Sequence, residues 1–162
     1  MKRARNTKSG KKSMASKDEP RITYSRRLAH LDAQAESILP NQVVEKDRND
    51  RGGLVSASDG MAGSAQFGCA QTLGFAWLCK GSRYFGDPEI LDRLALASDF
   101  AKKIRRPSGR FDLITTNWDC GPYTAFVVLA LAPIVAAARQ SSLPDAEQIE
   151  QQWSDVIRAV VP

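Results

Sequence analysis

Histidine and cysteine are scarce in this chain of 162 residues. The single histidine, His30, excludes metal sites that need several histidines within this chain. It also leaves any Ser-His-Asp or Cys-His arrangement dependent on one side chain, which we expect to be structural or solvated. The three cysteines, at positions 69, 79 and 120, lack the close pairing of a zinc site, and their odd number argues against a closed disulfide framework. We therefore expect reduced thiols, no metal and no cofactor.

Acidic residues are absent from positions 1–17, which carry seven lysines and arginines. The other 16 basic and 18 acidic residues leave a charge of −2 on the rest of the chain, although the whole chain has a net charge of +5. The basic character therefore belongs to the tail, and the body has no overall field that would attract nucleic acid. We predict a disordered basic tail at 1–17 and one domain at 18–162, with nucleic acid an unlikely partner that only the tail would contact.

No apolar segment of a secretory signal follows the basic tail, so a cytoplasmic location is the default expectation. The longest apolar run, 125–138, contains Pro133 and is short for a bilayer span. We expect no membrane insertion.

Apolar residues recur at helical spacing in five segments, and no segment alternates as a strand would. The segments cover about 25–39, 61–80, 88–106, 123–139 and a last stretch that starts with SSLPDAEQ. Asp87 and Pro88 form a helix start for the third segment. Long and short connections alternate, which is typical of stacked antiparallel helical hairpins, although a self-contained helical bundle also fits. The sequence therefore predicts an all-α fold.

Two helices carry further expectations about packing. Three glycines in the second helix, Gly63, Gly68 and Gly74, would let a neighbouring helix approach closely. The fourth helix is apolar nearly all round, which predicts a central position with cover on several sides. Only four other helices are available to cover it, so a homo-oligomer that covers exposed helix faces is a possible assembly.

The stretch from 82 to 128, SRYFGDPEILDRLALASDFAKKIRRPSGRFDLITTNWDCGPYTAFVV, resembles the N-terminal helical toroid of heparinase II/III-like polysaccharide lyases and their uncharacterised relatives. A G-D-P-x-[IL]-L turn of that family is similar to 86–91, and its D-G-x-F-D-L-x-x-T-N-like loop is similar to 108–117. The likeness covers about 53–140. It implies that the chain is part of an (α/α) toroid.

The resemblance also implies a chemistry. Such lyases cleave uronic-acid glycans by β-elimination, which requires neutralisation of the substrate carboxylate and a group that transfers a proton. The candidate catalytic residues are Asn117, as a donor to the carboxylate, and Tyr123, as the proton-transfer group. The candidate substrate-binding residues are Arg110 for a uronate, Trp118 for a sugar face, and Asp112 with Asp119 as a carboxylate pair of the kind glycoside hydrolases use.

Each candidate also has a structural interpretation. Asn117 or Asp119 can cap the fourth helix, Asp112 can order its loop, and the aromatic residues and Cys120 can be buried. A complete toroid needs roughly ten to fourteen helices and the lyases add a β-sandwich, so we expect a fragment or truncated form whose activity alone is doubtful. The expected partner is an acidic polysaccharide or oligosaccharide. The alternatives are a non-catalytic carbohydrate-binding or scaffold domain and a glycoside hydrolase-like toroid, and the family resemblance leaves export possible.

Overall fold

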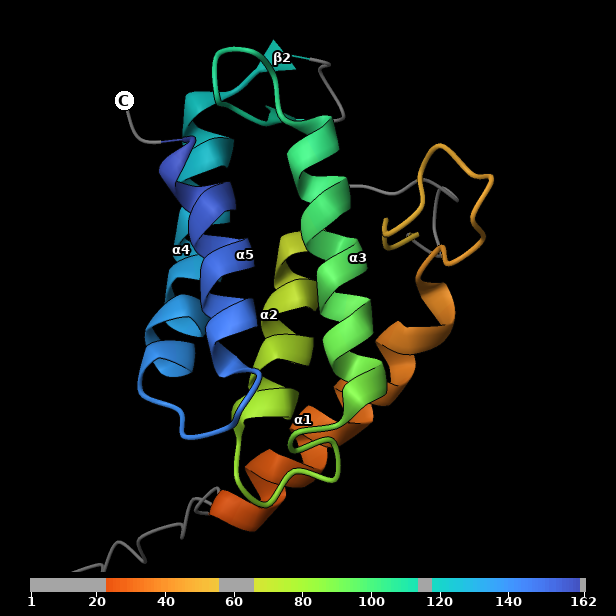
Figure 1. Cartoon of the computed structure of the whole chain (residues 1–162), viewed down its shortest axis with the longest axis vertical. Helices are drawn as coiled ribbons and strands as arrows, with labels where there is room; N and C mark the ends of the chain where they lie inside the picture. The colour runs from red at the N-terminus through yellow and green to blue at the C-terminus, as the bar shows by residue number, and fades with distance from the viewer. Residues whose placement is uncertain (1–22, 56–65, 114–117, 161–162) are drawn as a thin grey trace, which may run out of the picture.

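The computed structural model describes residues 23–55, 66–113 and 118–160, and this part of the chain is all-α (Figure 1). Five helices follow one another along the chain, with a single-turn 3-10 helix, η1, at Leu39–Asn41. The only strands among the described residues are two of two residues each, too short to leave an alternating pattern in the sequence. The helices are α1 (Tyr24–Ile38), α2 (Gln66–Leu78), α3 (Pro88–Ile104), α4 (Gly121–Arg139) and α5 (Ala146–Arg158).

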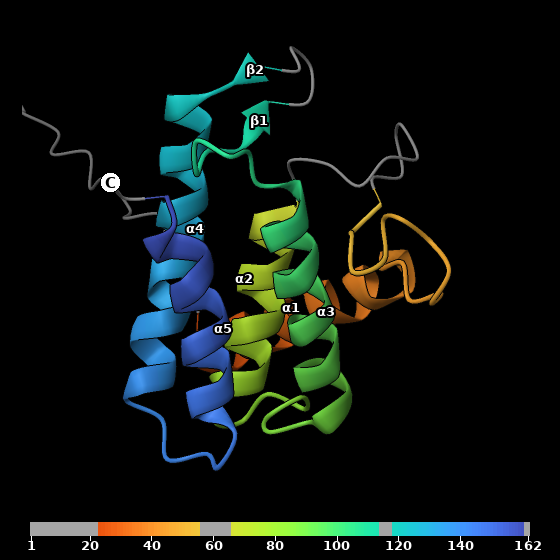
Figure 2. The same cartoon turned by 45° about the horizontal axis from the view of Figure 1, so that its top comes forward.

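Helices α2 to α5 lie side by side, and α1 crosses one end of them (Figures 1 and 2). Helix α2 packs against α1, α3 and α4, while α5 packs against α3 and α4. The hairpin of α2 and α3 therefore lies on the hairpin of α4 and α5, with one shared core between them. Its largest fully buried side chains are Trp77, Trp153, Phe111, Leu73, Ile90, Leu94, Leu131, Ile134 and Ile149.

The start of α3 confirms the predicted cap. One side-chain oxygen of Asp87, Oδ1, accepts hydrogen bonds from the backbone N–H groups of Glu89 at 2.8 Å and Ile90 at 3.4 Å. Pro88 occupies the first helical position, where its missing N–H would have no partner within the helix. The short connection from α2 to α3 thus ends at a residue that fixes where the next helix begins.

Close helix approach occurs at one of the three glycines in the second predicted helix. A Cβ atom on Gly74 would lie 2.7 Å from Cγ2 of Ile134, so α4 approaches α2 at a distance that only glycine permits. A Cβ on Gly68 would meet nothing within 4 Å, so the prediction is wrong there. Gly63 lies outside the described residues.

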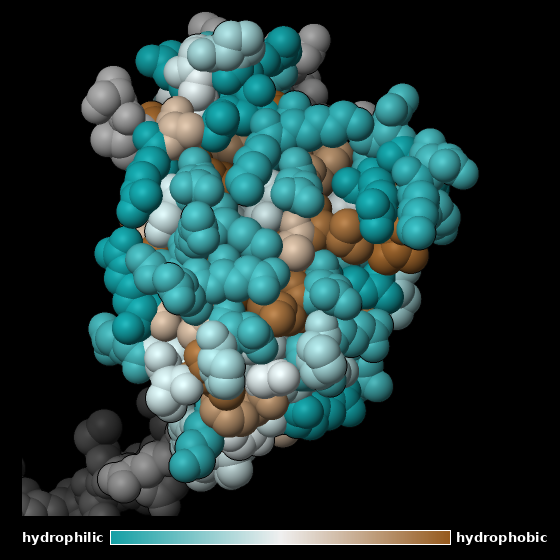
Figure 3. Space-filling model, in the orientation of Figure 1, coloured by the Kyte–Doolittle hydropathy of each residue, from teal (hydrophilic) through white to brown (hydrophobic). Residues whose placement is uncertain are grey.

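Helix α4 lies at an edge of the assembly, so the expectation that it is central is wrong. It contacts α2 on one side and α5 on another, which buries residues such as Val127 and Leu131. Its outer face is open, and Phe126 and Leu129 are each 67% exposed. By length and composition α4 could cross a membrane, and one third of that apolar stretch is buried in the described structure. The face that α3 and α5 present in Figure 3 is, by contrast, mostly hydrophilic.

The described part of the connection after α1 is irregular, and two buried glutamines join it to α3, Gln42 of the connection and Gln66 of α2. The Gln42 amide nitrogen donates to the carbonyl oxygens of Gly52 at 3.2 Å and Arg93 at 2.9 Å. The Gln66 amide nitrogen donates to the Ala97 oxygen at 3.3 Å, and its own oxygen accepts from the Leu54 N–H at 3.1 Å. Residues 42–54 are therefore attached to the bundle by side-chain amides.

Candidate functional site

The candidate residues gather at the end of the bundle where α3 finishes and α4 begins. Strands β1 (Asp112–Leu113) and β2 (Trp118–Asp119) form an antiparallel ladder there, beyond the N-terminus of α4 (Figure 2). Asp112 pairs with Asp119, and Leu113 pairs with Trp118. The ladder therefore places the two candidate carboxylates on directly opposed residues.

A buried phenylalanine fixes this ladder to the helices. Phe111 is 1% exposed, and its ring meets the Phe67 ring of α2 edge-on at 4.8 Å. Its N–H donates to Thr124 Oγ1 at 2.9 Å, and its carbonyl oxygen accepts from the Cys120 N–H at 3.2 Å. Because the Thr124 hydroxyl also donates to the Cys120 carbonyl oxygen at 2.8 Å, the strand ends are joined to the first turn of α4.

The turn before β1 rests on the far end of α5. Gly109 has a φ of +85°, and a Cβ there would lie 2.2 Å from the carbonyl oxygen of Ala159. Glycine is required on both counts, because other residues disfavour this φ and no side chain would fit. The Arg106 N–H donates to the Arg110 carbonyl oxygen at 2.9 Å and closes the turn. The end of α5 thus supports the loop that carries the candidate site.

Arg106 holds one member of the carboxylate pair. Its Nε donates to Asp112 Oδ2 at 2.7 Å, and its Nη2 forms an ion pair with the same oxygen. The pKa of Arg106 is raised, first by the hydrogen bond to Asp112 and then by the charge of Asp112, with a smaller contribution from Asp119. Arg106 therefore lies within the field of both carboxylates and offsets part of their mutual repulsion.

Each carboxylate of the pair keeps one buried oxygen without a hydrogen bond among the described residues. These oxygens are Oδ1 of Asp112 and Oδ1 of Asp119. An ionised carboxylate only accepts hydrogen bonds, and a buried acceptor without a donor is unfavourable. A donor group, such as a hydroxyl, that reached either oxygen would therefore stabilise it.

Tyr123 lies in the first turn of α4. Its ring is half-buried and meets the Phe67 ring at 6.5 Å, beside an apolar groove that also includes Phe126 and Ala130. Burial raises the pKa of Tyr123 to about 12. The phenol therefore stays protonated at neutral pH, which suits a hydrogen-bond donor better than a base.

Fewer contacts are described for the other three candidates, Arg110, Trp118 and Asn117. Arg110 is exposed, and its N–H donates to Ser108 Oγ at 3.3 Å. The backbone of Trp118 belongs to β2 beside the carboxylate pair. Asn117 lies outside the described residues.

The cap of α4 differs from the two candidates that the sequence offered. Cys120 is the N-cap residue, and its Sγ accepts a hydrogen bond from the Tyr123 N–H at 3.4 Å. Asp119 instead belongs to β2, so the interpretation of Asp119 as the cap is wrong. The other two cysteines, Cys69 and Cys79, are half-buried, and burial raises the pKa of both thiols. Low thiolate content makes them poor nucleophiles.

Comparisons with known proteins do not assign this chain to a family. No family model, curated protein or solved structure matches this chain. Within the described ranges, no group of three or more His, Cys, Asp or Glu side chains is arranged to hold a metal ion. The function proposed below therefore depends on the carboxylate pair and its surroundings.

Arg106 is the site residue that the sequence did not single out. It lies in a run of basic residues after α3, where an interaction with the helix dipole is the ordinary expectation. The ion pair with Asp112 depends on the turn that brings 106 back towards 112. The sequence signal for this ion pair is Gly109, which lies midway between Arg106 and Asp112. Glycine at this spacing is typical of a tight turn that would bring the two side chains together.

Proposed function

We propose that this chain is a saccharide-binding unit made of two helical hairpins, belonging to a glycan-active protein of the toroid kind. The observation that carries the proposal is the pairing of Asp112 with Asp119, each with a buried oxygen that lacks a donor among the described residues. Sugars present several hydroxyl donors on one face, and such donors satisfy paired carboxylate oxygens.

The neighbours of the pair fit the same ligand. Arg106 holds Asp112 in place, which preorganises the acceptor before a ligand arrives. Arg110 adds an exposed positive charge in the preceding turn, which would attract a uronate.

The packing of the helices supports the toroid part of the proposal. Helix α2 lies against α4 and α3 lies against α5, so one hairpin stacks on the next. The outer face of α4, with Phe126 and Leu129 exposed, is apolar where a further hairpin would continue the stack. The resemblance of 53–140 to the helical region of heparinase II/III-like lyases points in the same direction.

Binding without turnover is the activity that we propose for this chain alone. A β-elimination needs a base, and the high pKa of Tyr123 keeps that phenol protonated. In a lyase, Tyr123 would then act as the donor of a proton or hydrogen bond, with the base supplied by another group. Glycoside hydrolases use two carboxylates, and Asp112 and Asp119 lie on opposed residues of the ladder, which makes hydrolysis the second candidate.

Isothermal titration of the full chain with neutral and uronate-containing hexasaccharides tests the proposal. We expect binding to at least one class, with Asp112→Asn and Asp119→Asn each weakening it by about 10- to 100-fold, the usual range for a hydrogen bond to a charged group. Asp155→Asn, on the exposed side of α5, is the matched control and leaves binding unchanged.

Two product assays separate the alternatives. An unsaturated uronate, detected by its ultraviolet absorbance, would establish a lyase, and new reducing ends without that absorbance would establish a hydrolase. Binding that neither aspartate variant weakens would overturn the assignment of this site, and so would the absence of binding to every saccharide tested.

A further inference from the structure

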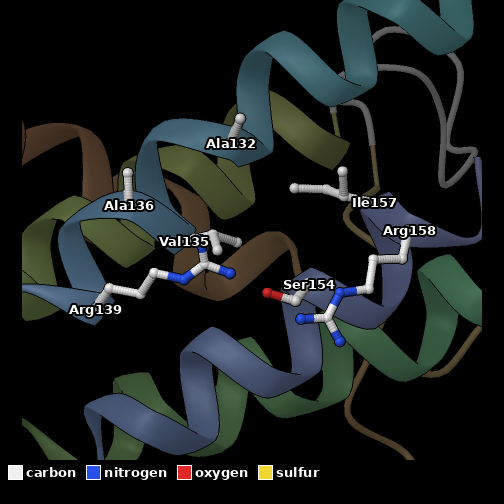
Figure 4. A pocket seen from close by; sticks show the side chains of 7 residues that line it. All are labelled: Ala132, Val135, Ala136, Arg139, Ser154, Ile157 and Arg158. Atoms are coloured by element: carbon white, nitrogen blue, oxygen red, sulfur yellow. The ribbon is translucent and has the colours of Figure 1, made fainter. Parts of the chain in front are cut away.

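A concave site lies between α4 and α5, and neither Asp112 nor Asp119 lines it. It is a groove of about 230 Å³, open at the surface. Its walls are mostly apolar, and two arginines and a serine supply the polar groups (Figure 4). The lining residues are Ala132, Val135, Ala136, Arg139, Ser154, Ile157 and Arg158.

Positive charge enters the groove from both helices. Arg139 comes from the last turn of α4 and Arg158 from the last turn of α5, and Figure 4 shows both guanidinium groups beside the hydroxyl of Ser154. Arg139 uses its Nε for an ion pair with Glu150 at 2.6 Å, which leaves its two Nη groups for another acceptor. Arg158 has no ion-pair partner among the described residues. The described lining residues and Glu150 together carry a net charge of +1.

The hydroxyl of Ser154 is the second and independent observation. Ser154 is 4% exposed, and its Oγ has no hydrogen-bond partner within the described structure. A serine inside a helix ordinarily bonds to the carbonyl oxygen four residues earlier, and this one does not. The oxygen points into the groove instead (Figure 4). A buried hydroxyl without a partner is unfavourable for folding, so an acceptor in the groove would satisfy it.

We propose that this groove binds a small organic carboxylate. The carboxylate oxygens accept from the Nη groups of Arg139 and from Arg158, and the Ser154 hydroxyl donates a third hydrogen bond. The apolar part of the ligand lies against Val135, Ile157 and the two alanines. Those walls favour an aliphatic acid over inorganic phosphate, because phosphate offers them nothing to bury.

The volume of the groove suits a small ligand. A water molecule occupies about 30 Å³ of the liquid, so the groove has room for roughly eight waters or one short branched acid. None of its residues belongs to the carboxylate pair or its loop. The inference therefore stands or falls separately from the proposed saccharide site.

Titration of the full chain with 3-methylbutanoate tests the inference, with thermal unfolding and amide NMR shifts as readouts. We expect a saturable rise in Tm and shifts centred on the last turns of α4 and α5. The uncharged isostere 3-methylbutanol and inorganic phosphate should each bind at least 10-fold more weakly.

Two variants and one control locate the binding. Arg158→Gln should weaken it 10-fold or more, while Arg27→Gln, an exposed arginine of α1, should leave it unchanged. Ser154→Ala should weaken it several-fold and yet raise the Tm of the free protein, because the buried hydroxyl without a partner is gone. A merely structural serine would not give that opposite pair of effects.

The overturning results are equally definite. Equal affinity for phosphate and 3-methylbutanoate, or equal affinity in Arg158→Gln and Arg27→Gln, would show only non-specific attraction to surface charge. The absence of any saturable response would show that no carboxylate of this class binds here.

Discussion

The close contact of α2 with α4 makes a quantitative prediction for Gly74→Ala. The new Cβ would lie 2.7 Å from Cγ2, 3.1 Å from Cδ1 and 3.3 Å from Cγ1 of Ile134. Ile134 is 0% exposed, so its side chain is held within the core and cannot turn out into solvent. Overpacking of this kind costs about 1–3 kcal/mol, and it opposes the gain of about 1 kcal/mol that alanine brings over glycine inside a helix.

The same helix provides a matched control in Gly68→Ala. A Cβ at Gly68 meets nothing within 4 Å, so only the helix-propensity term applies. We therefore expect Gly68→Ala to raise the free energy of unfolding by about 1 kcal/mol. Gly74→Ala should change it by between about 0 and −2 kcal/mol, the sum of the two opposing effects.

A double-mutant cycle isolates the steric contribution. Ile134→Ala removes all three atoms that a Cβ on Gly74 would touch, at a cost of about 2–5 kcal/mol for the cavity. In that background Gly74→Ala should become stabilising by about 1 kcal/mol or more, so the substitution changes sign. The coupling energy between the two positions should be about 1–3 kcal/mol.

Denaturant unfolding followed by circular dichroism measures all four proteins. The transition must be cooperative for the free energies to be compared, which coincident far-ultraviolet and tryptophan fluorescence curves would establish. If Gly74→Ala and Gly68→Ala stabilise equally in the native background, α2 and α4 do not pack at this distance and the reasoning is refuted.

Three further predictions follow from the described contacts. Cys120→Ser should raise the free energy of unfolding by about 0.5–1 kcal/mol in denaturant titrations, because a hydroxyl caps the Tyr123 N–H better than a thiol, whereas Cys120→Ala should lower it. Burial raises the pKa of Tyr123 from 10 in the unfolded chain to about 12 in the fold. Its stabilising contribution is thus complete below pH 10 and is lost as the pH rises towards 12. The loss should be roughly 1 kcal/mol, reduced from the full value of a two-unit shift because the phenol is partly exposed. A Tyr123→Phe variant that keeps the same alkaline loss would contradict this cause. Phe126→Lys combined with Leu129→Lys should leave the free energy of unfolding within about 1 kcal/mol and reduce any self-association seen by light scattering, because both side chains are exposed. Loss of several kcal/mol would mean that the outer face of α4 is covered in the free protein.

The helices could be predicted because their signals are local. Apolar spacing marked all five, and the Asp87–Pro88 start of α3 follows from the hydrogen-bonding needs of any helix N-terminus. The edge position of α4 could not be predicted from its composition. The apolar composition of a helix shows that its faces need to be buried. The number of neighbouring helices that bury them depends on how the rest of the chain packs.

The candidate site was predictable in part. The cluster of Asp112, Asp119 and Tyr123 near one helix start follows from the sequence itself, because a short loop keeps them close. The pairing of Asp112 with Asp119 depends on the ladder, and the half-buried state of the Tyr123 phenol depends on the packing against Phe67. The ion pair of Arg106 and the cap by Cys120 also arise only once the turn has formed.

The two buried glutamines have a consequence for how the protein opens. Gln42 and Gln66 bind the carbonyl oxygens of Arg93 and Ala97, which lie one turn apart on α3. The Leu54 N–H donates to the side-chain oxygen of Gln66, and the same side chain donates to Ala97 of α3. The Leu54 N–H therefore becomes exposed only when the Gln66 side chain releases it. Hydrogen exchange at Leu54 should be as slow as exchange in the middle of α3, although Leu54 belongs to no helix. The irregular segment and the third helix would then form a single cooperative unit of unfolding.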